Sequence, residues 1–175
     1  MVAIAQRKRQ PAADPTFAGL THLVAPAAEL ADLGRLTGAI DAAIAGAAEA
    51  GSAKTLPKKL HRDVIRLVAD QLADGRDKVR AALLEHPHAG LRVARSYTHI
   101  MDVVVAGVFH YCATHLHPAP IRTKGQRLAV VAVGGTGRGE MAPYSDVDLL
   151  FLTPYKQTAW GESVIESMLY ILWDL

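Results

Sequence analysis

Residues 128–153 have the sequence LAVVAVGGTGRGEMAPYSDVDLLFLT, in which two apolar segments flank a glycine-rich turn. The first segment, residues 128–133, is rich in valine and ends at Gly134-Gly135, which is typical of a buried strand that enters a tight turn. The second segment, residues 147–152, is apolar except for Asp148. We therefore predict two strands joined by a sharp turn.

Two carboxylates, Asp146 and Asp148, stand at the start of the second predicted strand. Because strand side chains alternate between faces, residues two apart point the same way, and we expect both carboxylates at one rim of the sheet. Two ionised carboxylates beside an apolar core are costly unless a cation lies between them. Mg²⁺, with Mn²⁺ as the alternative, prefers oxygen ligands and often joins carboxylates to substrate phosphates. Backbone N–H groups of a glycine turn can hold phosphate, since no Cβ blocks their approach. The pattern indicates a metal–nucleotide site, and the plainer alternative is a solvated strand end.

The order of these motifs resembles that of the polymerase-β-like nucleotidyltransferases: a strand, Gly134-Gly135, residues 137–140 (GRGE) and residues 145–150 (SDVDLL). More narrowly, the run VGGTGRGEMAPYSDVDLLFL resembles the family of uridylyltransferases that modify the PII nitrogen-signalling protein. The sibling glutamine synthetase adenylyltransferases typically have a GGRELN turn, whereas this chain places a glycine before Arg138 and before Glu140. Uridylyltransferases usually carry an aromatic residue where this chain has Thr136, so no stacking role is assigned there.

The resemblance implies transfer of UMP from UTP to a tyrosine hydroxyl of PII, with release of pyrophosphate. Asp146 and Asp148 would be the catalytic residues and would hold the metal ion. Arg138 would neutralise phosphate charge, unless it pairs with Glu140 or a helix end. The implied nucleotide- and phosphate-binding residues are Gly134, Gly135, Arg138 and Ser145, and Ser145 has the alternative role of closing the local turn.

The family pattern adds a third carboxylate from a later strand, and no such strand follows residue 152 here, because Asp174 falls in a predicted helix. The chain also stops on an apolar helical residue, Leu175, which favours a truncated protein. Two alternatives stay open: an adenylyltransferase of the same superfamily, and a truncated chain that binds nucleotide or a partner without turnover. These motifs predict neither the base that is bound nor the oligomeric state. The uridylyl-removing and glutamine-sensing domains of larger family members are not expected in these residues.

The composition is that of a globular protein, with 50% hydrophobic residues and a formal net charge of +2. Such a small charge gives no reason to expect nucleic acid as a partner. The single cysteine, Cys112, excludes an internal disulfide and fits a reducing cytoplasm. Neither a signal peptide nor about 18 uninterrupted apolar residues is present, so we expect a cytoplasmic protein without membrane contact.

Apolar residues recur at helical spacing through most of the remaining chain. We predict a flexible tail over residues 1–27, a helical region over 28–118 and the start of a nucleotidyltransferase domain over 119–175. Helices are expected over residues 29–50, 58–86, 91–115 and 160–175, with the third the most buried. The predicted fold class is α+β: a helical N-terminal half followed by a truncated polymerase-β-like nucleotidyltransferase core, a small mixed sheet with flanking helices.

One cluster outside the predicted nucleotidyltransferase domain has the composition of a zinc site: His110, Cys112, His115 and His117. In an α-helix successive residues are about 100° apart, so side chains five residues apart diverge by about 140°. We therefore predict that His110 and His115 do not share an ion while one helix runs through both. Cys112 is predicted to be a packed core thiol.

Overall fold

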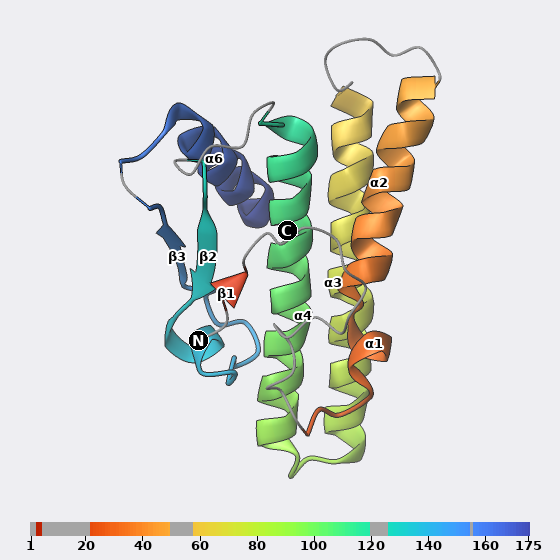
Figure 1. The fold of residues 1–175 in the computed structure, drawn as a ribbon. Coiled ribbons are helices and arrows are strands. Elements are labelled where there is room, and N and C mark those ends of the chain that lie inside the picture. The colour runs from red at the N-terminus through yellow and green to blue at the C-terminus, as the bar shows by residue number, and fades with distance from the viewer. Residues whose placement is uncertain (1–2, 5–21, 50–57, 120–125, 155) are drawn as a thin grey trace.

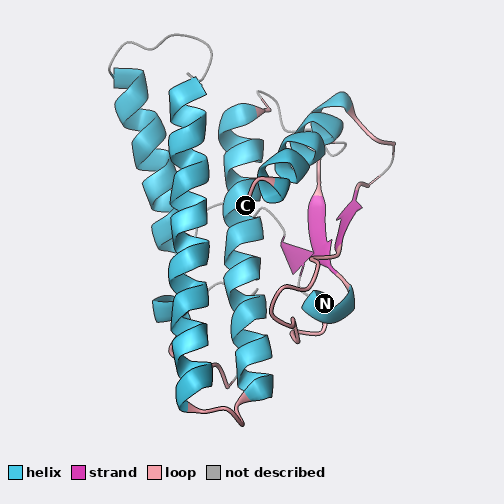
Figure 2. Ribbon diagram, turned by 180° about the vertical axis from the view of Figure 1, so that it is seen from behind, coloured by secondary structure: helices cyan, strands magenta, loops and turns pink. Residues whose placement is uncertain are grey.

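The computed structural model describes residues 3–4, 22–49, 58–119, 126–154 and 156–175, and one long helix, α4 (Gly90–Tyr111), runs through its middle. The helices on one side of α4 are α1 (Ala27–Leu30), α2 (Leu33–Glu49) and α3 (Lys58–Glu85) (Figure 1). The sheet and helix α6 (Ala159–Trp173) lie on its other side, as Figure 2 also shows from behind. The four predicted helices are confirmed, except that the first is divided before Leu33. Within the described residues, no helix is both long and apolar enough to cross a lipid bilayer.

The sheet has three described strands in the order β1 (Ala3–Ile4), β2 (Ala129–Ala132) and β3 (Leu149–Leu152). Both pairings are antiparallel, and Ala132 pairs with Leu149 at the end of the β2–β3 ladder. The α+β class is confirmed. A mixed sheet was expected, but both pairings among the described strands are antiparallel.

The N-terminal segment is more ordered at its described residues than the tail expected over 1–27. Ala3 pairs with Val131 in the sheet. The carbonyl oxygen of Leu23 accepts a 2.7 Å hydrogen bond from Arg92 Nη2 on α4. The rest of the tail lies outside the described residues, as do residues 50–57 and 120–125. The domain boundaries stay a prediction.

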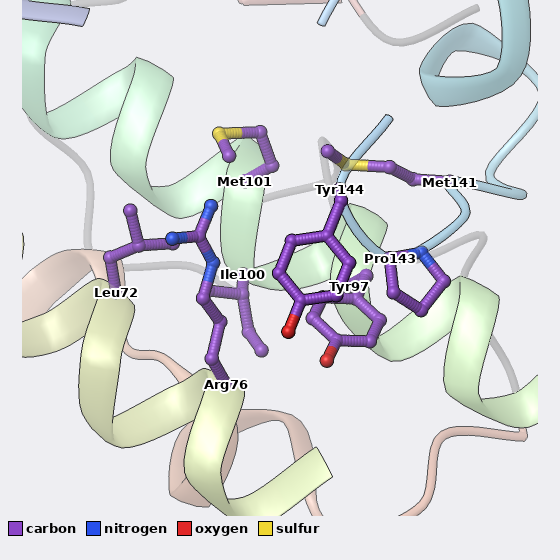
Figure 3. A pocket seen from close by; sticks show the side chains of 8 residues that line it. All are labelled: Leu72, Arg76, Tyr97, Ile100, Met101, Met141, Pro143 and Tyr144. Atoms are coloured by element: carbon purple, nitrogen blue, oxygen red, sulfur yellow. The ribbon is translucent and has the colours of Figure 1, made fainter. Parts of the chain in front are cut away.

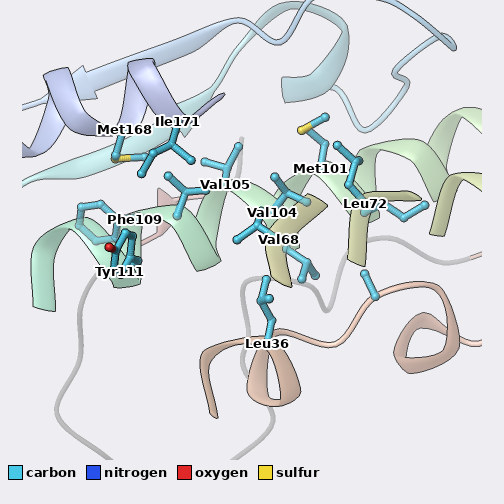
Figure 4. Packing of buried hydrophobic residues seen from close by; sticks show 14 of the residues in the cluster. Leu36, Val68, Leu72, Met101, Val104, Val105, Phe109, Tyr111, Met168 and Ile171 are labelled. Atoms are coloured by element: carbon cyan, nitrogen blue, oxygen red, sulfur yellow. The ribbon is translucent and has the colours of Figure 1, made fainter. Parts of the chain in front are cut away.

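The core is built around α4, which is covered from two sides. Leu36, Val68 and Leu72 approach it from α2 and α3, while Met168 and Ile171 approach it from α6 (Figure 4). Burial of one such side chain contributes about 1.5–3 kcal/mol to folding. The expectation that this helix is the most buried is confirmed, since nearly all of its residues from 98 to 109 are inaccessible to solvent.

Helix α4 continues into a wider π-helical turn, η2 (Cys112–Leu116), in which the backbone N–H of His117 donates to the carbonyl of Cys112 over 2.9 Å. In this geometry residues five apart lie about one turn from each other. His110 and His115 consequently meet, and the Nε2 atom of each lies 2.7 Å from Asp41 Oδ1. The prediction that they diverge is wrong, because the α-helix does not run through both. Cys112 is a buried core thiol, as predicted.

Candidate active site

A single helical turn, α5 (Gly134–Gly137), follows β2 directly. Gly134 has φ +62°, a left-handed conformation that favours glycine. Gly137 packs so closely on the end of β2 that a Cβ there would lie 2.5 Å from the carbonyl oxygen of Ala132. The turn closes when the N–H of Glu140 donates to the carbonyl of Gly135 over 3.0 Å. The sharp turn predicted from the glycines is confirmed.

Asp148 is held against this turn by its backbone and its side chain. Its carbonyl oxygen accepts a 2.9 Å hydrogen bond from Val133 N–H, which extends the β2–β3 pairing by one residue. Its carboxylate lies over Gly134, where a Cβ would collide with Asp148 Oδ2. The missing side chain at Gly134 therefore leaves the space that the carboxylate occupies.

Asp146 and Asp148 line the same cavity, of about 510 Å³, although both precede β3, which begins only at Leu149. The rest of the wall is mainly apolar and comes from α4 and α6, with Arg76 from α3. Both carboxylates are exposed, and neither forms an ion pair with a described residue. The two carboxylates therefore lie beside the glycine turn without an ion-pair partner among the described residues. Such a set of oxygen donors fits a hard divalent cation.

The other two predicted site residues are Arg138, which is not among the residues that line this cavity, and Ser145, which is. Arg138 is exposed directly after α5 and, among the described residues, makes no ion pair with Glu140. Ser145 lines the cavity, and its Oγ donates to the carbonyl of Ala142 over 2.8 Å. Ser145 thus closes the local turn, which is the alternative role expected for it.

A smaller cavity of about 40 Å³ lies beside the first one and shares Arg76 with it. Figure 3 shows the side chains of Arg76, Tyr97 and Tyr144 among those that line this smaller cavity. Burial, together with the neighbouring Tyr144, raises the pKa of Tyr97. Arg76 follows the buried Leu72 by four residues, which places it on the edge of the apolar stripe of α3.

Polar side chains of α4 lie against the glycine turn and the segment that follows it. Thr98 Oγ1 accepts a 3.0 Å hydrogen bond from the N–H of Met141. Asp102 and Thr136 are 6% and 4% exposed and line a small cavity between α4, β2 and the turn. Among the described residues, Asp102 Oδ2 and Thr136 Oγ1 have no hydrogen-bond partner. Burial raises the pKa of Asp102 to about 7. A lone carboxylate within the apolar run DVVVAGVF was the sequence signal for this residue.

Comparisons with known proteins agree with this geometry. Residues 120–175 match the nucleotidyltransferase domain family. The chain is 54% identical over 112 residues to the bifunctional uridylyltransferase/uridylyl-removing enzyme of Ruegeria pomeroyi, covering 64% of this chain and 12% of that enzyme. For the enzyme of the same description from Cereibacter sphaeroides, the identity is 40% over 165 residues, or 94% of this chain and 17% of the relative. The chain thus spans less than a fifth of the length of these curated relatives. No solved structure matches it.

Proposed function

We propose that this chain, which belongs to the nucleotidyltransferase family of the bifunctional uridylyltransferase/uridylyl-removing enzymes, carries the metal- and phosphate-binding part of a site for UMP transfer. The protein that contains it would transfer UMP from UTP to a tyrosine hydroxyl of PII and release pyrophosphate. Support for the target and the nucleotide comes from the relatives' names and from the motif resemblance. A cytoplasmic location stays a prediction.

The observation that carries the proposal is the placement of the Asp148 carboxylate over Gly134, in the cavity that Asp146 also lines. Asp146 and Asp148 would hold Mg²⁺ or Mn²⁺. A divalent cation in such a site neutralises the charge of the triphosphate and orients it for in-line attack. The two carboxylates would fix the position of the bound nucleotide relative to the turn.

The remaining residues would bind and orient the nucleotide. Gly134 and Gly135 have no side chain of their own, so their backbone N–H groups would hold the β/γ-phosphates beside the Asp148 carboxylate. Arg138 at the end of the turn and Arg76, which lines the cavity, would supply positive charge for the phosphates. Ser145 would keep the carboxylate segment in its turn through the bond to Ala142. The apolar wall of the cavity would exclude water from the bound nucleotide.

The test is equilibrium binding of UTP and of ATP to the 175-residue chain with Mg²⁺ present, using calorimetry. We expect UTP to bind better than ATP, Asp148→Asn to weaken UTP binding about tenfold or more (about 1.4 kcal/mol), and the exposed α6 control Glu166→Gln to bind like wild type. Preference for ATP would favour the adenylyltransferase alternative and refute the uridylyl assignment. Absence of nucleotide binding to the folded chain would refute the site itself.

Turnover requires a separate measurement, in which PII is incubated with the chain and UTP labelled at the α-phosphate. Label on PII that is lost in Asp148→Asn would support transfer. Nucleotide binding without label on PII would favour the binding-only alternative for this chain.

A further inference from the structure

A second group of potential metal ligands lies away from the candidate active site, where α4 passes into η2. His110, His115 and Asp41 each offer one ligand atom, and these three atoms lie within 4.8 Å of one another. Both Nε2 atoms point to the same carboxylate oxygen, Asp41 Oδ1, at 2.7 Å. In Figure 1 this end of α4 lies at the top, whereas the glycine turn that follows β2 lies below.

The backbone brings the two imidazoles together, so their proximity does not depend on a chance side-chain rotamer. The i to i+5 bond between His117 N–H and the Cys112 carbonyl widens the helix between the two histidines. His115 also contacts the ring of Tyr111, whose hydroxyl lies 2.9 Å from His61 Nδ1 on α3. A π-helical turn of this kind is rare and occurs frequently at functional sites.

The three ligand atoms have the chemistry of a transition-metal site. Two imidazole nitrogens and one carboxylate suit Zn²⁺, Co²⁺ or Ni²⁺ better than Mg²⁺, which prefers oxygen ligands. A zinc ion bound at about 2.0–2.1 Å needs ligands roughly 3.3 Å apart, so these atoms would have to separate by about 0.6 Å. The side chains are 28%, 18% and 51% exposed for His110, His115 and Asp41, which leaves room for that movement and an open side for water as a fourth ligand.

The imidazoles of His110 and His115 can exchange their hydrogen bonds to Asp41 for bonds to a metal ion. A metal-bound imidazole presents the Nε2 lone pair and carries its remaining proton on Nδ1, so binding releases a proton from any imidazole that was charged.

We propose that Asp41, His110 and His115 form a site for a divalent transition metal, with zinc as the natural occupant and water as the fourth ligand. The ion would join α2 to the end of α4. That end also anchors α6, because His117 Nε2 lies 2.8 Å from Ser167 Oγ and the His117 carbonyl accepts from Trp160 Nε1 over 2.7 Å. A bound ion would thus tie the helical half to the helix that covers the sheet.

The experiment titrates the metal-free 175-residue chain with Zn²⁺ by calorimetry, and with Co²⁺ by visible absorption. We expect one high-affinity ion per chain, a cobalt spectrum with nitrogen ligation and a higher melting temperature with one equivalent of Zn²⁺. His115→Ala and Asp41→Asn are expected to weaken binding about 100-fold or more, since even outer-shell changes cost 10–100-fold. The exposed His88→Ala is the matched control and should bind like wild type.

Asp41→Asn and one further variant, Asp148→Asn, keep the outcome decisive. Asp41→Asn retains an amide oxygen of similar size on an exposed position, so it separates metal loss from a failure to fold. Asp148→Asn excludes the candidate active site as the place of zinc binding and should leave the high-affinity ion in place. Absence of one-to-one binding, binding that survives His115→Ala and Asp41→Asn, or equal loss in His88→Ala would each overturn the proposal.

Discussion

Replacement of Gly134 by alanine tests the link between the glycine turn and the carboxylate site. The residue has φ +62°, a conformation that costs an L-residue about 1–2 kcal/mol. The new Cβ would also collide with Asp148 Oδ2. Because the Asp148 side chain is exposed, it can rotate away, so the collision adds little to the loss of stability. We expect the free energy of unfolding to fall by about 1–2 kcal/mol and UTP binding to weaken about tenfold or more (about 1.4 kcal/mol).

The assay combines urea unfolding with Mg²⁺-dependent UTP binding. Gly38→Ala is the matched control, because a Cβ there meets nothing within 4 Å in helix α2, and it should stabilise the chain by up to about 1 kcal/mol without changing UTP binding. If Gly134→Ala acts by moving Asp148, its effect on binding should largely disappear in the Asp148→Asn background. Unchanged stability together with unchanged UTP affinity in Gly134→Ala would refute this reasoning.

Three further predictions concern the helix beneath the site. Between about pH 4 and 7, Asp102 keeps a proton in the native state that it has lost in the unfolded state. The free energy of unfolding of the wild type should therefore fall as pH rises through this range, by at most about 4 kcal/mol, and level off above pH 7. Asp102→Asn should flatten this pH dependence. Urea unfolding at pH 5 and pH 8 checks this. An equal change in the free energy of unfolding between the two pH values, for the wild type and for Asp102→Asn, would contradict it. Thr98→Val leaves the buried N–H of Met141 without its acceptor and should cost about 1–3 kcal/mol in the same assay, whereas a loss near zero would show that the bond does not hold the turn. Cys112, whose pKa burial raises to about 12, should react with a thiol reagent only after unfolding, and immediate reaction of the native chain at pH 8 would disagree.

Local patterns predicted much of the fold and of the candidate site. Apolar residues at helical spacing located α3 and α4, because each helix buries one face or all faces in the core. The glycines identified the turn, because its backbone leaves no room for a side chain. Together with the two aspartates they also identified the family, which the comparisons confirm. The roles of the individual site residues stay predictions.

Other features depend on contacts that no local pattern contains. The π-helical turn follows from a shift of one backbone hydrogen bond at Cys112, which leaves no periodic signal in the sequence. The meeting of His110 and His115 on Asp41 depends on that shift and on a helix about 70 residues earlier in the chain. Arg76 reaches the active-site cavity only because α3 packs beside α4.

The most direct test of the metal–nucleotide site is the anomalous scattering of Mn²⁺ in crystals of this chain grown with UTP. We expect a manganese peak between the carboxylates of Asp146 and Asp148, with the triphosphate over Gly134 and Gly135. A manganese peak elsewhere, with Asp146 and Asp148 bound to neither metal nor nucleotide, would contradict the assignment.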